Sequence, residues 1–392
     1  MVYTGALLRR RSNLTAMIES SGCTVILQPV NAVVENIDWY SFLGRAPLPA
    51  AGADSLALLS RHRVLITGAG GSIGSALVRR VVALGCEVIL LESAESNLHE
   101  VQRTLSGDRL SRTGTFYLGN ASDPALVDEI FAVHRPQLVF HTAAFKYLPL
   151  LEEQPLAAIA NNIFATETLA AAASRHGVRM VLLSTDKAVA PGSVMGATKY
   201  VAEQIVLSNG GTAVRLANVL GSRGSVSEIF AAQIVSGTPL TVTDREARRY
   251  FITISEAVEL LLAASVHRDA GGLFVPQLTK AHSIADLARF LSKAVAPGRE
   301  IPIEFTHLRP GEKKRERLWS ADETPGEASP DGLVRVELLL QPWNRLIERL
   351  NELRMQVEQR DLGGAIRCLC ELVPCYQPSG AILQQAAIIH YG

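Results

Sequence analysis

Short apolar runs alternate with longer amphipathic stretches over residues 63–218. Runs of this kind, rich in Val, Ile and Leu, predict buried strands, and they cover residues 63–68, 87–92, 115–120, 137–144, 179–185 and 212–218. Apolar positions recur at helical spacing between them, in residues 72–84, 124–134, 155–176 and 197–208. This alternation predicts βαβ units with right-handed crossovers. We therefore expect an α/β fold with a doubly wound parallel sheet over residues 61–224.

The pattern becomes less regular after residue 225. It predicts helices over residues 227–236, 255–266 and 284–294, and strands over 240–243, 272–276 and 301–307, which together form a smaller α+β substrate-binding lobe over 225–320. Residues 321–332 are polar and contain Pro and Gly, which predicts a linker or exposed loop. Residues 342–361 predict an amphipathic helix with Leu346, Leu350 and Leu353 on one face. We expect 321–392 to be a linker and C-terminal helical extension, with this face packed inside the chain.

Composition narrows the choice of partners and of compartment. The 392 residues include 38 Lys and Arg and 38 Asp and Glu, and this balance argues against nucleic acid or an anionic membrane as a partner. No apolar run approaches the ~18–20 residues that span a bilayer, and we find no secretory signal. The five cysteines are odd in number and match no zinc-binding spacing. These features predict a cytoplasmic protein with no transmembrane segment and no metal site.

A glycine-rich turn follows the first predicted strand and opens the first helix. Gly68, Gly71 and Gly74 have the spacing G-x-x-G-x-x-G, which allows a tight turn and a close approach of the backbone to a pyrophosphate at the helix N-terminus. The next strand ends in Glu92, which is placed to bind the adenosine ribose. No Lys or Arg follows Glu92 closely, so a 2′-phosphate would be repelled. We expect a Rossmann-type domain that binds NAD rather than NADP; a turn without a ligand is the alternative.

Chemically active side chains follow the predicted strand 179–185. Thr185, Asp186 and Lys187 lie at its carboxyl end, where open α/β sheets bind their ligands. Met195 and Lys199 are spaced i, i+4, so they share one face of the next helix. An acid and two amines near a nucleotide loop predict proton and hydride chemistry on a bound small molecule. In the alternative interpretation, Asp186 and Lys187 form an exposed ion pair that contributes little.

Several motifs follow one another in a recognisable order over residues 36–318. They are RVLITGAGGSIG at 63–74, FHTAAFKYLPLLE at 140–152, Asn162, the segment 183–199 with its Ser-Thr-Asp-Lys and Met-x-x-x-Lys patterns, NVLGSRGSV at 218–226, and HLRPGEK at 307–313. In this order they resemble the extended short-chain dehydrogenase/reductases, and among these the CapD-like UDP-N-acetylglucosamine 4,6-dehydratases. The resemblance implies NAD-dependent dehydration of a UDP-N-acetylhexosamine, with UDP-N-acetylglucosamine as the expected substrate, to a 4-keto-6-deoxy sugar nucleotide for capsule, glycan or polysaccharide biosynthesis.

Such a dehydration needs a base for the C5 proton, an acid for the C6 hydroxyl and a donor to the C4 oxygen. The resemblance implies that Lys187 is the base, Asp186 the acid, Thr185 the donor and Lys199 a ribose contact. A lysine base would need its pKa lowered by burial or by a nearby cation. Met195 completes the catalytic set. Most short-chain dehydrogenases have Tyr at this position, whereas the membrane-anchored branch of the dehydratases also has Met there. The acceptor of the O4 proton stays open among Asp186, Thr185 and a water held by Lys199.

The resemblance also implies two sets of binding residues. The cofactor set is Gly68, Gly71, Ser72, Ile73, Gly74, Glu92, Asn120, Ala121, Ala143, Ala144, Lys146, Asn162 and Lys199. The substrate set is Lys146, Asn218, Arg223, Arg249, Arg309 and Glu312. Arginine suits a diphosphate because its planar fork donates two hydrogen bonds at once.

Two other functions are compatible with parts of this sequence. A nucleotide-sugar 4-epimerase would share the first hydride step, but it normally relies on the Tyr that Met195 replaces. A non-catalytic NAD or nucleotide-sugar-binding protein is the alternative from another class. Relatives pair through the helices that correspond to 155–176 and 197–208, so we expect a homodimer or higher homo-oligomer. Residues 1–60 are expected to be an N-terminal extension, with 1–45 a remnant of a preceding Rossmann-like domain.

Overall fold

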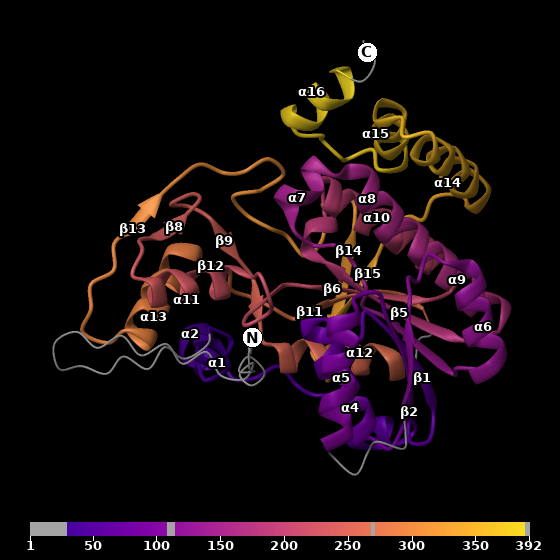
Figure 1. Ribbon diagram of the computed structural model, residues 1–392, viewed down its shortest axis with the longest axis horizontal. Coiled ribbons are helices and arrows are strands. Elements are labelled where there is room, and N and C mark those ends of the chain that lie inside the picture. The colour runs from indigo at the N-terminus through magenta and orange to yellow at the C-terminus, as the bar shows by residue number, and fades with distance from the viewer. Residues whose placement is uncertain (1–29, 108–113, 268–270, 389–392) are drawn as a thin grey trace, which may run out of the picture.

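A nine-stranded sheet forms the centre of the protein, and the computed structural model describes residues 30–107, 114–267 and 271–388 (Figure 1). In order across the sheet, the strands are β14 (Thr324–Ala328), β15 (Leu333–Glu337), β11 (Gly272–Pro276), β6 (Thr212–Leu216), β5 (Arg179–Thr185), β4 (Leu138–His141), β1 (Arg63–Thr67), β2 (Glu87–Glu92) and β3 (Gly114–Leu118). Every neighbouring pair from β11 to β3 is parallel. The order runs in opposite directions from β1, which confirms the predicted doubly wound parallel sheet.

Helices cover both faces of this sheet. One core cluster joins the sheet to α4 (Ser72–Ala83), α5 (Glu95–Gly107) and α12 (Ile254–Val266), and the other joins it to α6 (Pro124–His134), α9 (Ala165–Arg175) and α10 (Val194–Ser208). Successive side chains of a strand point to opposite faces, so Val64 and Ile66 belong to the first cluster and Leu65 to the second. Both faces are buried, which is why the strands are continuous apolar runs rather than alternating ones.

The helix predicted over 155–176 contains one π-helical turn. It consists of α8 (Pro155–Ile159), the π turn Ala160–Phe164 and α9. Single π turns inside α-helices occur frequently at functional sites, and this one carries Asn162. The run Pro155–Arg175 is long and apolar enough to cross a bilayer, but 61% of its apolar window is buried inside the protein. This burial is that of a core helix.

The smaller lobe has its own core, but the assignment of residues 255–266 and 272–276 to it is wrong, because α12 packs on the central sheet and β11 pairs with β6. The core of the lobe is built on α11 (Val226–Ser236), α13 (Ile284–Val295) and the parallel pair of β8 (Leu240–Val242) and β13 (Ile303–Phe305). Short paired strands complete it: β7 (Asn218–Val219) with β10 (Phe251–Ile252), and β9 (Arg248–Arg249) with β12 (His282–Ser283). Val34, Trp39 and Leu43, from α1 (Val30–Glu35) and α2 (Trp39–Leu43), pack into the same core. Residues 1–29, which hold most of the predicted domain remnant, lie outside the described residues.

The prediction of a loop over residues 321–332 is wrong. This segment contains β14, which pairs antiparallel with β15, and β15 pairs antiparallel with β11, so both strands extend the sheet. All five residues of β14 are exposed, and its sequence TPGEA has none of the apolar alternation that identifies a strand. An edge strand of this kind is held by its backbone hydrogen bonds to one neighbour, and these leave no pattern in the side chains.

Of the three C-terminal helices, α14 (Trp343–Glu358) and α15 (Leu362–Leu372) pack beside α8, α9 and α10, and α16 (Gly380–Ile388) packs beside α7 (Leu148–Glu153) and α15 (Figure 1). Leu346, Leu350 and Leu353 are fully buried in the shared core, which confirms that the predicted leucine face packs within the chain. Arg354 of α14 forms a 2.6 Å ion pair with Glu167 of α9. The chain's own C-terminal helices thus cover part of the helical face through which relatives were expected to pair.

A buried ion-pair network links β6 and α10 to the start of the edge strand β14. Arg215 of β6 is fully buried and forms ion pairs of 2.8 Å with Glu203 of α10 and 2.7 Å with Glu323, the residue before β14. Ser184 of β5 also donates to Glu203. Burial opposes the charge of Arg215, but the two carboxylates hold its pKa above the usual value. The network anchors β14 to the strand and helix that carry the candidate site.

Candidate active site

The glycine-rich turn between β1 and α4 is packed too closely for side chains. Gly68 has φ +64°, and a Cβ there would lie 2.7 Å from the backbone of Ala143. A Cβ on Gly74 would lie 2.1 Å from the Gly68 carbonyl oxygen. These contacts bring the turn against the end of β4 and directly before the N-terminus of α4, the place where such turns bind a pyrophosphate.

A cavity of about 250 Å³ opens beside this turn. Among the predicted cofactor residues, those in its lining are Gly68, Gly71, Glu92, Asn120, Ala121, Ala143 and Ala144. The Glu92 carboxylate accepts hydrogen bonds of 2.9 Å from the Gly70 N–H and 3.0 Å from the Ala94 N–H. It is therefore fixed at the end of β2 before any ligand arrives. The turn, the carboxylate and the cavity fit a dinucleotide.

Gly74→Ala is expected to weaken dinucleotide binding, because the new methyl group cannot share space with the Gly68 carbonyl. The affinity for NAD, measured by isothermal titration calorimetry, should fall by at least about tenfold, since each 1.4 kcal/mol lost is a factor of ten. Gly52→Ala is the control, because its Cβ would meet nothing closer than 3.8 Å. Unchanged affinity in a folded Gly74→Ala variant would place the dinucleotide elsewhere.

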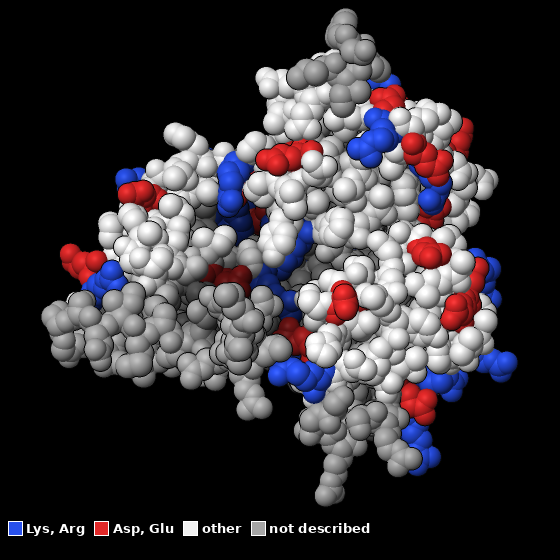
Figure 2. All heavy atoms as spheres, in the orientation of Figure 1, with Lys and Arg blue, Asp and Glu red and all other residues white. Residues whose placement is uncertain are grey.

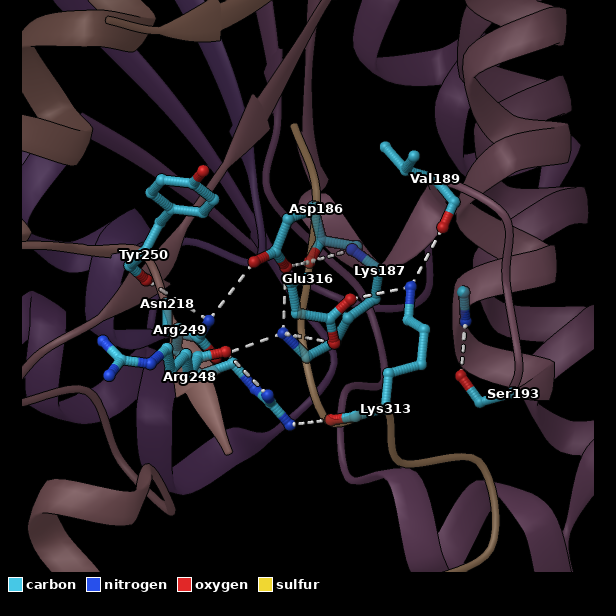
Figure 3. A network of polar contacts seen from close by, with 12 residues as sticks. Asp186, Lys187, Val189, Ser193, Asn218, Arg248, Arg249, Tyr250, Lys313 and Glu316 are labelled. Atoms are coloured by element: carbon cyan, nitrogen blue, oxygen red, sulfur yellow. Dashed lines mark hydrogen bonds and ion pairs between the residues drawn. The ribbon is translucent and has the colours of Figure 1, made fainter. Parts of the chain in front are cut away.

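Asp186 and Lys187 lie in a short 3₁₀ turn directly after β5 and face one another (Figure 3). The Lys187 amine donates to Asp186 Oδ1 at 2.9 Å and to Asn218 Oδ1 at 3.1 Å. The Asn218 amide donates in turn to Asp186 Oδ2 at 3.2 Å, and the Thr185 hydroxyl donates to Asp186 Oδ1 at 3.0 Å. The side chain of Asp186 is 0% exposed and that of Lys187 15%. The alternative of a solvent-exposed ion pair is therefore wrong.

A third charged group, which the sequence analysis missed, joins this pair. The Glu316 carboxylate lies 3.9 Å from the Lys187 amine and 2.7 Å from that of Lys313. Burial raises the pKa of Asp186, and the charge of Glu316 adds to this rise while Lys187 opposes it. Burial acts the same way on Glu316, but Lys187 and Lys313 outweigh it and lower the pKa of Glu316. The only sequence signal was one acid within the basic run KKRER at 313–317.

Lys199 lies on α10, where burial lowers its pKa to about 8 although Glu203 opposes the shift. Its charge acts on His141, whose pKa burial and Lys199 together lower to about 3. His141 lies 2.7 Å from the Thr67 hydroxyl and 3.0 Å from that of Thr166, so it is a core residue whose ring nitrogens both have partners. Thr67 directly precedes Gly68, so the contact of His141 with Thr67 joins β4 to the start of the nucleotide turn.

The loop that precedes α10 is held from several directions. The buried Glu152 accepts a 2.8 Å hydrogen bond from the Val194 N–H and one of 2.6 Å from the Ser379 hydroxyl of the C-terminal extension. Lys313 donates to the Val189 carbonyl at 2.9 Å. These contacts fix the start of α10, and with it the buried Met195.

Asn162 and Lys146 shape the segment between β4 and α7 (Leu148–Glu153). Asn162 accepts from the Phe145 N–H at 2.8 Å, and its amide donates to the Phe145 carbonyl and to the Thr198 hydroxyl, each at 3.1 Å. It acts here by holding the backbone. The Lys146 amine donates to the Arg223 carbonyl at 2.6 Å, and burial lowers its pKa.

Lys and Arg side chains gather in the hollow between the two lobes (Figure 2). Of the predicted substrate residues, only Asn218 contacts the Asp186–Lys187 pair by hydrogen bonds. Arg223 crosses to the nucleotide turn instead, where its guanidinium donates at 3.0 Å to the Gly70 carbonyl and to Asn97. Its N–H donates to the Ser72 hydroxyl at 2.9 Å. It therefore lies on the cofactor side of the hollow.

The other predicted substrate residues belong to one loop and to β9. The Arg249 guanidinium donates to the carbonyls of Lys313 and Lys314 at 2.6 and 3.0 Å, which holds that loop in place. Arg309 and Glu312 pair with one another at 3.0 Å on the surface. Within the described residues, no group of three or more His, Cys, Asp or Glu side chains could hold a metal ion.

Known proteins share both the sequence and the fold. The family described as "Polysaccharide biosynthesis protein" matches residues 64–337. The capsular polysaccharide biosynthesis protein CapD of Staphylococcus aureus is 39% identical over 307 residues, which cover 74% of this chain and 50% of CapD. A UDP-glucose 4-epimerase of Rickettsia rickettsii is 34% identical over 66% of this chain and 78% of its own. The structure of Pen from Bacillus thuringiensis matches with a TM-score of 0.66 and 29% identity over 71% of this chain and 89% of Pen. The chain thus spans about half the length of CapD.

Proposed function

The chain belongs to the polysaccharide biosynthesis protein family, and on this premise we propose that it dehydrates a UDP-N-acetylhexosamine to the 4-keto-6-deoxy sugar nucleotide. UDP-N-acetylglucosamine is the expected substrate. Relatives named for capsule and polysaccharide biosynthesis support a role in making the sugar nucleotides of such polymers. The cytoplasmic location and the homo-oligomeric state stay predictions.

The observation that carries this proposal is the Asp186–Lys187 pair, buried at the carboxyl edge of the same sheet as the nucleotide turn. Elimination of water across C5 and C6 needs a base and an acid at neighbouring atoms. In Asp186 the raised pKa favours the protonated form that an acid needs. Lys187, 2.9 Å away, is the group that we assign to take the C5 proton.

Cofactor binding is assigned to the cavity beside the nucleotide turn. NAD, when bound there, would take the hydride from C4 and return it to C6, so the reaction has no net oxidation. The Glu92 carboxylate would accept from the adenosine ribose, which favours NAD over NADP. Lys199 would contact the second ribose, and the Thr185 hydroxyl would donate to the C4 oxygen. Arg249, Arg309 and Glu312 remain candidates for the nucleotide end of the sugar substrate.

A 4-epimerase is the second candidate, because the Rickettsia relative carries that name at 34% identity. An epimerase returns the hydride to C4 and has no need for an acid and a base at C5 and C6. The buried pair, together with Met195 in place of Tyr, therefore favours dehydration. A non-catalytic binding protein would gain nothing from burying Asp186, because burial of a carboxylate is costly.

Incubation with UDP-N-acetylglucosamine, UDP-N-acetylgalactosamine, UDP-glucose and dTDP-glucose separates these functions. We expect a UDP-N-acetylhexosamine product that is lighter by one water in mass spectrometry. A product of unchanged mass but inverted C4 in NMR spectra would indicate the epimerase. Steady release of reduced cofactor would indicate a dehydrogenase, and binding without any product would indicate the non-catalytic alternative.

A further inference from the structure

Glu316 reaches the Asp186–Lys187 pair from a loop far away in the sequence (Figure 3). The loop is fixed by β9, because the Arg248 N–H and the Arg249 guanidinium both donate to the Lys314 carbonyl, at 2.9 and 3.0 Å. Arg249 also donates to the carbonyl of Lys313. The position of the Glu316 carboxylate therefore does not depend on a substrate.

Two buried carboxylates share one amine in this site. The Lys187 amine lies 2.9 Å from Asp186 Oδ1 and 3.9 Å from Glu316 Oε1. The side chains of Asp186 and Glu316 are 0% and 2% exposed. Like charges so close, with so little water, disfavour the state in which both carboxylates are ionised. One carboxylate is therefore expected to hold a proton.

The surroundings decide which carboxylate keeps that proton. Glu316 keeps a cation of its own, Lys313, at 2.7 Å even while Lys187 is neutral, and the Arg249 charge lies nearby on β9. Asp186 has no cation other than Lys187, and its remaining partners are the neutral groups of Thr185 and Asn218. When the environments of two carboxylates push their pKa values apart in this way, the one with the higher pKa serves as the acid. The proton belongs on Asp186.

We infer that Glu316 is a positioning residue for both proton transfers of the proposed reaction, on which this inference rests. Its ionised carboxylate keeps Asp186 protonated and faces the charge that Lys187 acquires. As Lys187 takes the C5 proton, the electron pair of the C5–H bond forms the C5–C6 double bond. The C6–O bond breaks, and the Asp186 proton goes to the leaving hydroxyl. One proton enters the site and one leaves with water, so its net charge is constant.

The order of ionisation can be measured directly. In wild-type protein labelled with ¹³C at the Asp and Glu side-chain carboxyls, Glu316 should titrate at lower pH than Asp186, with Asp186→Asn and Glu316→Gln as assignment variants. In Glu316→Gln, the Asp186 midpoint should fall by about one unit or more, the usual effect of losing one nearby like charge. Glu316→Asp keeps a charge, so the Asp186 midpoint should return most of the way to its wild-type value. Glu327→Gln on the exposed β14 should leave the Asp186 midpoint unchanged.

The pH profile of water loss gives a second readout. Asp186 can act as an acid only below its own midpoint, so the alkaline limb of the profile should move to lower pH in Glu316→Gln. A reversed order of titration in the wild type, or an unmoved Asp186 midpoint in a folded Glu316→Gln, overturns the inference. If the wild type forms no dehydrated product while the titration order holds, the proposed function fails and the electrostatic role of Glu316 stands.

Discussion

Lys187→Ala is expected to slow the loss of water by about a thousandfold, within the ~10²–10⁴-fold range that a positioned acid or base contributes. The variant loses the amine that lies 2.9 Å from Asp186, which is the group assigned to take the C5 proton. Catalysed exchange is the measurement. In D₂O, the wild type should place solvent deuterium at C5 of the product, and Lys187→Ala should place none there on the same timescale.

Binding must be separated from chemistry in this experiment. NAD affinity should stay near the wild-type value, because Lys187 is absent from the lining of the dinucleotide cavity. Lys293→Ala, at an exposed position of α13, is the matched control and should keep full exchange. Deuterium uptake at the wild-type rate in Lys187→Ala would remove Lys187 from the role of base.

Arg215→Ala should lower the free energy of unfolding by about 3–5 kcal/mol, the usual cost of breaking a buried ion pair by removing one partner. Arg215 is the shared partner of Glu203 and Glu323, and all three are buried or nearly so. Its loss leaves two carboxylates without their cation beneath the site and frees the segment that leads into β14. Denaturant unfolding, followed by circular dichroism, measures the change.

A surface ion pair serves as the control that shows whether burial causes the stability loss in Arg215→Ala. Arg175 and Asp128 are 2.5 Å apart, but both side chains are more than half exposed. Arg175→Ala should therefore cost no more than about 1 kcal/mol. If the free energy of unfolding falls equally in the two variants, the network around Arg215 does not stabilise the edge strand β14.

The parts of the fold that the sequence predicts are those with a local cause. Both faces of the central strands are buried, so β1 and β5 are apolar runs that can be recognised without their neighbours. Gly68 and Gly74 mark the turn because only glycine fits its backbone contacts. Asp186 and Lys187 could be placed from the end of β5 alone.

The parts that were missed depend on contacts between distant segments. The strand β14 is defined by pairing with β15, and its side chains are all exposed. Glu316 enters the site through a loop that β9 positions, and no spacing in the sequence relates it to Asp186. Arg223 was assigned to the sugar substrate from its motif, yet its guanidinium lies against Gly70 and Asn97. Each of these placements depends on contacts between segments that are distant in the sequence.

The helices that cover α10 belong to the same chain as α10 itself. Leu346, Leu350 and Leu353 belong to the same core as α10, and they are tethered to it through β15. Their local concentration is therefore set by the length of the chain rather than by the number of molecules in solution. Dilution cannot remove a cover of this kind, so the helix that carries Met195 and Lys199 keeps its enclosure even where copies of the protein are scarce.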